Sequence, residues 1–518
     1  MDEIRLNFEG FMDGASTAPL SGVTGREHLF GLHPLVVFLL FQLLLWTLGP
    51  TLLFGNLHAD TLEAAYWGRD WQLGYFKHPP LLSWTLDLAL RTGLQPILAL
   101  MLLSQLTVLV TAWFVWRIAR LYASRETAAL AVVLCVISPS ATVYGVQLNH
   151  NSMLAPFWAA TAWFGLSWLE ERRMVDAVLL GIVAGLGMIT KYEILFVLAT
   201  LMVAGIAIPR FRPAFTHPGS YVAGALFVAI VTPHIWWLAS HDWPSFSRAM
   251  GADKMSSLSD LNVSGVNLIV GLFTIFIVPA IVLVATARRR ERDELTAGPA
   301  YRLIALILLL VPIFVLVLGA MVTQQVLKPL WLLPLASTTA IGLAILWPAG
   351  NAGFGLRMKD SARIGMIGSS SIFGAFALYL LIAGLIGKPL AAYSVDTRYL
   401  AQQTQALWDA QSKQPLACVV IADRKIGPSG VLWFESRPDF VDFSSPGWHQ
   451  SEQIAQCRKS GGIAVLSEGR EGIESFPRAC LDQAQRINVP ASGGMGRATF
   501  PVELIYIPAE EAGICPPR

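Results

Sequence analysis

Charged residues are scarce in this sequence, and their scarcity decides the class of protein. Asp, Glu, Lys and Arg make up 14% of the 518 residues, whereas a soluble globular protein carries about 25%. Hydrophobic residues make up 54%, and the mean hydropathy is +0.55. Apolar runs of about twenty residues, the length that crosses a bilayer core, recur through the first three quarters of the chain. The sequence therefore predicts a polytopic α-helical membrane protein.

The sequence also lacks the features of a nucleic-acid-binding protein and of a zinc or redox site. The net charge is only +2 and there is no basic tail, so no nucleic acid is expected as a partner. None of the five cysteines forms a CxxC pair. Cys135 lies in an apolar run and is expected to be a buried free thiol. The other four permit two disulfides in three pairings, with free buried thiols as the alternative; they are Cys418, Cys457, Cys480 and Cys515.

The apolar runs predict about eleven membrane-spanning helices. Residues 1–33 are expected to form a cytoplasmic tail, 34–388 a transmembrane domain with its first outer loop at 56–95, and 389–518 an extracytoplasmic domain. The predicted spans are 34–55, 96–116, 127–147, 152–169, 174–190, 193–209, 219–240, 263–286, 302–322, 329–347 and 364–387.

Lys and Arg collect in alternate loops between these spans. With eleven spans, all the clusters lie on the side of the N-terminus, which the positive-inside rule assigns to the cytoplasm. The loop at 56–95 and everything after residue 388 then face outward. The clusters are 117–125, 172–173, 210–212, 288–292 and 357–363.

The region 389–518 is more polar and predicts a small α/β domain. A position outside the membrane would allow its disulfides to persist. The expected strands are 418–423, 431–435, 462–468 and 502–508, and the expected helices are 395–412 and 448–459.

The first outer loop holds the densest group of ionisable side chains. Asp60 follows the first span, and Glu63, three residues later, shares its face if the loop opens with a helix. An outward-facing carboxylate can accept a proton from a hydroxyl and so act as a general base. The alternative is that Asp60 only caps the helix.

Four cationic or ionisable groups on the outward side suit an anionic leaving group such as a lipid phosphate. Lys77 and His78 stand directly before a rigid Pro-Pro pair, and Lys191 and Lys328 lie in later outward segments. The alternative for the lysines is anchoring at the membrane surface.

Several polar and aromatic side chains on the same side are candidates for contact with a sugar or an acceptor. The Asn-His-Asn run at 149–151 could hydrogen-bond a sugar or only cap the following helix. No second histidine shows the spacing of a metal ligand, so no metal is expected. The candidates are Tyr66, Tyr75, Asn149, His150, Asn151, Tyr192 and Glu193.

Four stretches resemble glycosyltransferase family 39 in its bacterial, membrane-embedded form. The first outer loop opens with Asp60 and ends in GYFKHPP at 74–80, and three further stretches match in order: QLNHNSMLAPFW (147–158), GLGMITKYEILFVL (185–198) and LKPLWLLP (327–334). This family has the GT-C fold and includes protein mannosyltransferases and the aminoarabinose and galacturonic acid transferases of lipid A. Two positions depart from its pattern. Thr61 stands where many members have Glu, and Asn151 replaces a second acidic residue.

The resemblance implies an inverting transfer of a sugar from a polyprenyl phosphate to a hydroxyl, with Asp60 at the catalytic position and no metal. It also implies a bacterial inner membrane, with the site in the periplasm. Lipid A or the lipopolysaccharide core is the expected acceptor, and protein O-mannosylation is the alternative. Two other classes stay open: a transporter or flippase of lipid-linked glycans, although no inverted repeat is evident, and a binding protein that has lost catalysis.

Overall fold

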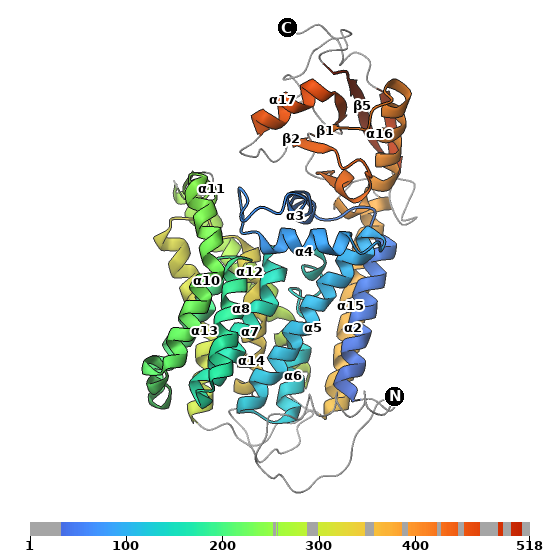
Figure 1. Ribbon diagram of the computed structural model, residues 1–518. Coiled ribbons are helices and arrows are strands. Elements are labelled where there is room, and N and C mark those ends of the chain that lie inside the picture. Colours follow the sequence, from blue (N-terminus) through green and yellow to red (C-terminus); the bar gives the residue numbers. More distant parts are fainter. Residues whose placement is uncertain are drawn as a thin grey trace, which may run out of the picture.

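The computed structural model is a helical bundle with a small domain at one end (Figure 1). It describes residues 33–251, 255, 257–286, 299–347, 357–385, 392–421, 426–443, 450–466, 485–490 and 499–509. The predicted tail, apart from residue 33, and the basic cluster at 288–292 lie outside these residues.

Each predicted apolar run contains a helix of the bundle. A 3₁₀ segment at Gly145–Gln147 precedes α7, another at Pro209–Thr216 follows α9, and a third at Pro329–Leu335 leads into α14. The bundle helices are α2 (Pro34–Leu53), α5 (Pro96–Tyr122), α6 (Arg125–Val136), α7 (His150–Glu171), α8 (Met174–Met188), α9 (Ile194–Ala207), α10 (Pro218–Ser240), α12 (Leu258–Thr286), α13 (Pro299–Val322), α14 (Ala336–Leu346) and α15 (Met358–Leu385).

Among the described residues, seven helices are long and apolar enough to cross a membrane, or eight if the bent pair of α9 and the following 3₁₀ segment is one span. The chain is thus a multi-pass membrane protein, and the number of eleven spans stays a prediction. The run at 127–147 holds a shorter helix than expected. α6 ends at Val136, and Ser138-Pro139-Ser140 begins a series of turns.

Buried polar side chains join the two helices that flank the bundle. Trp46 of α2 donates a hydrogen bond to Ser369 of α15 (2.9 Å), and the Ser369 hydroxyl donates to Gln42 (2.6 Å). Gly365 lets α15 approach α2 closely, because a Cβ there would lie 2.7 Å from the Phe38 ring. A membrane interior offers no water to such groups, so satisfying them within the protein stabilises the pair.

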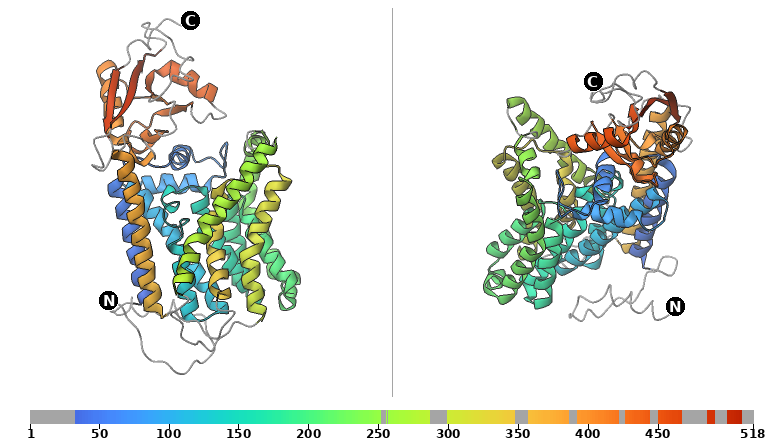
Figure 2. Two further views of the ribbon diagram at one scale, coloured as in Figure 1. Left: turned by 180° about the vertical axis from the view of Figure 1, so that it is seen from behind. Right: turned by 45° about the horizontal axis from the view of Figure 1, so that its top comes forward.

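Two short helices lie across the end of the bundle that carries the C-terminal domain, called the upper end below (Figure 1). They are α3 (Ala59–Gly68) and α4 (Leu81–Leu90). The described basic clusters lie at the loops of the opposite end, between α5 and α6, α7 and α8, and before α10 and α15. The C-terminal domain stands over the α2–α15 side, and α11 (Pro244–Gly251) rises on the other side of the bundle (Figure 2).

The C-terminal domain has a five-stranded mixed sheet in the order β2-β1-β3-β5-β4. β1 pairs in parallel with β2 and β3, and β5 pairs antiparallel with β3 and β4. Its elements are α16 (Thr397–Gln411), β1 (Cys418–Ile421), β2 (Asp439–Asp442), α17 (Gln450–Ser460), β3 (Gly462–Leu466), β4 (Gln485–Pro490) and β5 (Thr499–Ile507).

One predicted strand of this domain is wrong. The run 431–435 begins in a 3₁₀ helix at Ser429–Leu432 and ends in a turn. Its apolar side chains are divided between two clusters. Leu432 belongs to the cluster that includes the first outer loop, with Trp433 packed against it, Phe434 packs against the core of the C-terminal sheet, and Val431 contacts both. The two strands that the sequence did not reveal, β2 and β4, lie at the two edges of the sheet.

Cys418 of β1 and Cys457 of α17 form a disulfide, one of the pairings that the sequence allows. Cys135 is a buried free thiol, as expected. Cys480 and Cys515 lie outside the described residues.

Candidate active site

α3 places the two candidate carboxylates at the upper end of the bundle. The N-cap of this helix is His58, whose ring accepts a hydrogen bond from the Asp60 N–H (3.3 Å). The alternative that Asp60 is the cap is therefore wrong. The Asp60 side chain is 37% exposed and lies 3.7 Å from His58 Nδ1. A carboxylate in the first turn of a helix is stabilised by the N-terminal end of the helix dipole.

Glu63, one turn further along α3, forms an ion pair with Lys77. The Lys77 Nζ lies 2.5 Å from Glu63 Oε1, and the two side chains are 16% and 19% exposed. The Lys77 ammonium also lies 6.0 Å from the centre of the Trp67 ring, which stacks on Tyr75. These contacts hold Lys77 against the carboxylate-bearing helix.

The segment that carries Lys77 and His78 is fixed internally and to two helices of the bundle, α7 and α8. The Tyr75 N–H donates to the His78 carbonyl (3.1 Å), and the Leu81 N–H donates to Ile189 at the end of α8 (3.0 Å). The His78 ring lies against the ring of His150, the first residue of α7, with the ring centres 3.9 Å apart and the ring planes inclined by 31°. The Pro79 carbonyl also accepts a hydrogen bond from His150. The Pro-Pro pair therefore fixes these side chains by contact as well as by its own rigidity.

Lys191 reaches the same place from the connection between α8 and α9. Its side chain is buried, forms an ion pair with Glu193, and donates to Asn151 Oδ1 (2.6 Å). Its ammonium lies 5.8 Å from the ring of Trp331, three residues after Lys328. Asn151, at one of the two positions that depart from the family pattern, thus accepts a hydrogen bond from Lys191.

The pKa of His78 reflects the positive charges around it. Burial lowers the pKa of His78 well below its usual value, and the charges of His150, Lys191, Lys77 and Lys328 lower it further. The imidazole is therefore neutral near pH 7, surrounded by lysines from three separate segments. The structure brings together all four residues that the sequence predicted for a phosphate site.

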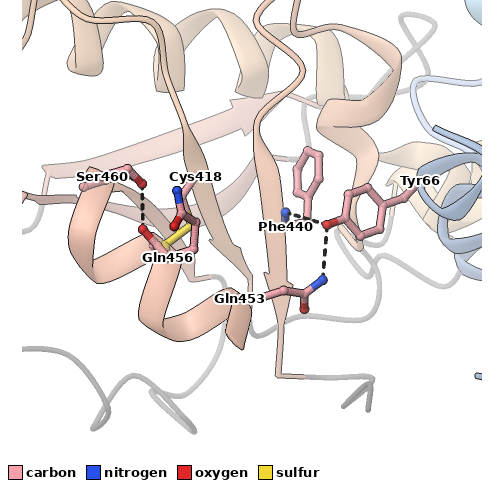
Figure 3. Close-up of a disulfide and its surroundings, with 8 residues drawn as sticks. Tyr66, Cys418, Phe440, Gln453, Gln456 and Ser460 are labelled. Atoms are coloured by element: carbon pink, nitrogen blue, oxygen red, sulfur yellow. Dashed lines mark hydrogen bonds between the residues drawn. A yellow bond between two sulfur atoms is a disulfide. The ribbon is translucent and has the colours of Figure 1, made fainter. Parts of the chain in front are cut away.

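The remaining candidates divide between this site and its surroundings. Asn149 caps α7, accepting hydrogen bonds from the N–H groups of Asn151 (2.9 Å) and Ser152 (3.3 Å). Tyr192 hydrogen-bonds to His234 of α10 (2.9 Å). Tyr66 instead faces the C-terminal domain, where its hydroxyl accepts from the Phe440 N–H and from Gln453, both at 3.3 Å (Figure 3). Contact of these side chains with a sugar stays a prediction.

Two residues that hold the first outer loop in place were not predicted from the sequence. His234 lies inside an apolar run and bonds to the Leu73 carbonyl (2.8 Å). Asp87 of α4 is buried and accepts hydrogen bonds from Trp71 (2.7 Å), Arg91 (2.6 Å) and Arg437 (3.1 Å). A single ionisable residue within an apolar stretch was the available signal in both cases.

Within the described part of the chain, no group of three or more His, Cys, Asp or Glu side chains is placed to hold a metal ion.

The first outer loop and the cluster of cations lie in or next to a segment that matches a known family. Residues 77–237 match the family described as dolichyl-phosphate-mannose-protein mannosyltransferase. In structure, the chain is similar to ArnT from Cupriavidus metallidurans, solved bound to undecaprenyl phosphate (TM-score 0.56, 13% identity, covering 93% of this chain and 99% of ArnT) and in the apo state (TM-score 0.58, 15% identity, same coverage). The fold is the GT-C fold, and the predicted fold class is confirmed.

Three curated relatives come from Rhizobium johnstonii. The lipid A galacturonosyltransferase RgtD is 28% identical over 35% of this chain and 38% of its own length. The lipopolysaccharide core galacturonosyltransferase RgtB is 22% identical over 40% of this chain and 42% of its own length. RgtA, also named a core galacturonosyltransferase, is 21% identical over 80% of this chain and 83% of its own. The chain thus spans about two fifths of the length of the first two relatives.

Proposed function

We propose that this protein is an integral-membrane glycosyltransferase that moves a sugar from a polyprenyl phosphate to a hydroxyl of lipid A or of the lipopolysaccharide core. The observation that carries the proposal is the convergence of Lys77, Lys191 and Lys328 around His78, beside the helix that bears Asp60 and Glu63. Cations that converge from separate segments form a site for an anion, and a polyprenyl phosphate is an anion at a membrane surface.

In the proposed reaction, Asp60 takes the proton of the acceptor hydroxyl while the hydroxyl oxygen attacks the anomeric carbon from the face opposite the phosphate. The bond between the anomeric carbon and the phosphate oxygen breaks, and its electron pair leaves with the polyprenyl phosphate, so the configuration inverts. The lysines stabilise the charge that grows on this leaving group. Glu63 holds Lys77 in place, and general-base assistance contributes typically about 10²–10⁴ in rate.

The named relatives support the choice of substrates. Three of them are named as galacturonosyltransferases of lipid A or of the lipopolysaccharide core, and ArnT was solved with undecaprenyl phosphate. An acidic sugar such as galacturonate also suits a site with three lysines. We therefore propose a polyprenyl-phosphate hexuronate as the donor, with no metal required.

We further propose that the protein lies in a bacterial inner membrane with its upper end in the periplasm. The basic clusters at the opposite end support this orientation through the positive-inside rule. A disulfide between Cys418 and Cys457 also suits an oxidising compartment for the C-terminal domain.

The test is transfer by the purified protein in proteoliposomes, with undecaprenyl phosphate galacturonate as donor and lipid A from a strain without galacturonate as acceptor. We expect mass spectrometry to show lipid A heavier by one hexuronate with the wild type and with Asp409→Asn, a change at an exposed carboxylate on α16. Asp60→Asn should fold, bind donor and lose at least about 99% of the transfer.

Near-wild-type turnover by Asp60→Asn would refute Asp60 as the base. Absence of any lipid product, with the sugar found instead on periplasmic proteins of cells that express the gene, would replace the lipid acceptor by a protein acceptor.

A further inference from the structure

α3 is held between the bundle and the C-terminal domain. On the bundle side, Leu62 and Ala65 are fully buried, and the Thr61 hydroxyl donates to the Gln147 carbonyl. On the other side, Tyr66 and Arg69 reach the sheet of the C-terminal domain. A helix of ten residues is marginal on its own, so these two sets of contacts determine where it lies.

Tyr66 meets the sheet at a free edge. β2 is an edge strand, and the Asp439 N–H bonds back toward β1 through the Ala417 carbonyl (2.8 Å). Successive residues of a strand point their N–H groups to opposite sides, so the Phe440 N–H faces away from the sheet. The Tyr66 hydroxyl accepts it (3.3 Å), and the Tyr66 ring packs edge-on against Phe440 at 5.4 Å. The loop thus occupies a position that a further strand could take.

The second donor to Tyr66 comes from a helix that the disulfide fixes. Gln453 of α17 donates to the Tyr66 hydroxyl (3.3 Å), and the Cys418–Cys457 disulfide ties the same helix to β1 (Figure 3). Both hydrogen bonds that the Tyr66 hydroxyl accepts therefore come from groups of the C-terminal domain. Burial also raises the pKa of Tyr66 to about 12, so the hydroxyl is neutral at physiological pH.

A second contact of the same kind holds the end of α3. Arg69 donates to the carbonyls of Pro438 (2.8 Å) and Arg437, and Arg437 donates to Asp87 of α4 (3.1 Å). Arg437 and Pro438, which precede β2, therefore form hydrogen bonds with both α3 and α4. The charged groups facing Tyr66 belong to this contact and include Arg69, Asp70 and Asp439.

We propose that Tyr66 is a positioning residue, through which the C-terminal domain sets the orientation of α3 and hence of Asp60 and Glu63. This inference rests on the proposed function for the roles of those two carboxylates. It replaces the prediction that Tyr66 contacts the sugar or the acceptor. The reason is that a catalytic group displaced by about 1 Å can lose about 10²-fold in rate, and Tyr66 lies only three residues from Glu63 on a short helix.

The experiment compares Tyr66→Phe, Gln453→Leu and their double variant in the full-length protein. The matched control is Tyr506→Phe, because Tyr506 lies on β5 and contacts Trp408 instead of α3. The first measurement is hydrogen exchange of the peptide 59–68. We expect exchange several-fold faster in Tyr66→Phe and wild-type exchange in the control. The double variant should equal Tyr66→Phe, since the Gln453 hydrogen bond is already lost there.

The second measurement is the kinetics of transfer. Tyr66→Phe should lower kcat about tenfold, with KM for donor and for acceptor unchanged within about twofold. The double replacement Cys418→Ser and Cys457→Ser, which frees α17 from β1, should shift both readouts in the same direction by a smaller amount.

Each other outcome overturns the proposal. Unchanged exchange in Tyr66→Phe would show that the domain does not hold α3 through this hydroxyl. A raised acceptor KM with unchanged kcat would make Tyr66 a substrate ligand, and faster exchange with unchanged kcat would separate the position of α3 from catalysis. If the wild type transfers no sugar, the proposed function fails, and the exchange measurement still decides whether Tyr66 holds α3.

Discussion

Replacing Lys77 by Met tests the phosphate site, and the structure allows its two effects to be separated. The first effect is on stability, because Glu63 keeps its charge and loses the ion pair with Lys77. Removing one member of a buried ion pair costs about 3–5 kcal/mol, and the cost here is smaller because the two side chains are 16% and 19% exposed. The double variant Glu63→Gln/Lys77→Met leaves no unpaired charge and should recover most of that loss.

The second effect is on donor binding. A hydrogen bond to a charged group contributes about 1.5–3 kcal/mol, and about 1.4 kcal/mol is a factor of ten in Kd. Both Lys77→Met and the double variant should therefore bind undecaprenyl phosphate about 10–100-fold more weakly. The assay is titration of the purified protein in nanodiscs at fixed salt, with thermal unfolding measured in parallel. A Kd within twofold of the wild type in the double variant would show that Lys77 does not bind the phosphate.

Three further outcomes follow from the structure. Lys328→Met, at an exposed lysine, should weaken binding of undecaprenyl phosphate with little change in melting temperature; equal affinity would remove Lys328 from the site. Peptide mapping without reductant should recover Cys418 linked to Cys457, and free thiols at both would contradict the fold of α17. Since the pKa of His78 is lowered, the unfolded state takes up a proton near pH 6.5 and the folded state does not. Stability should therefore fall below pH 6.5, and His78→Gln should reduce that slope by up to about 1.4 kcal/mol per pH unit; an unchanged slope would place His78 in water.

The sequence located the segments that lie together at the candidate site, whereas the roles of their residues stay predictions. The Pro-Pro pair after Lys77 and His78 signalled a fixed segment, and the outward lysines at 191 and 328 signalled an anion site. What the sequence could not show was which side chains pair. Glu63 was expected beside Asp60, yet the ion pair it makes is with Lys77, fourteen residues away across a turn. Such pairing depends on the return path of the loop, which no local pattern records.

In the C-terminal domain, local sequence patterns failed to predict some of the strands. The run VLWFE at 431–435 has the composition of a strand, but its apolar residues are divided between the cluster of the first outer loop and the core of the C-terminal domain. β2 and β4 are edge strands, and the polar residues among them, such as Asp439 and Gln485, hide the alternation that marks a half-buried strand. Contacts with α3 and the first outer loop therefore influence the local structure of residues 429–443, and no pattern within a short stretch of sequence can reveal such contacts.

In the proposed function, the ion pairs of Lys77 and Lys191 with carboxylates explain how a site for phosphate can exist before the donor arrives. Lys77 lies against Glu63 and Lys191 against Glu193, and an unpaired buried cation would cost several kcal/mol. The donor phosphate must therefore share the lysines with these carboxylates or displace the carboxylates. Either way, the affinity for the donor is lower than it would be if the lysines had no carboxylate partners. A moderate affinity also favours release of the polyprenyl phosphate product. The same pairs that keep the empty site stable thus prevent the leaving group from blocking it, and they account for carboxylates other than Asp60 at the site without giving them a role as a base.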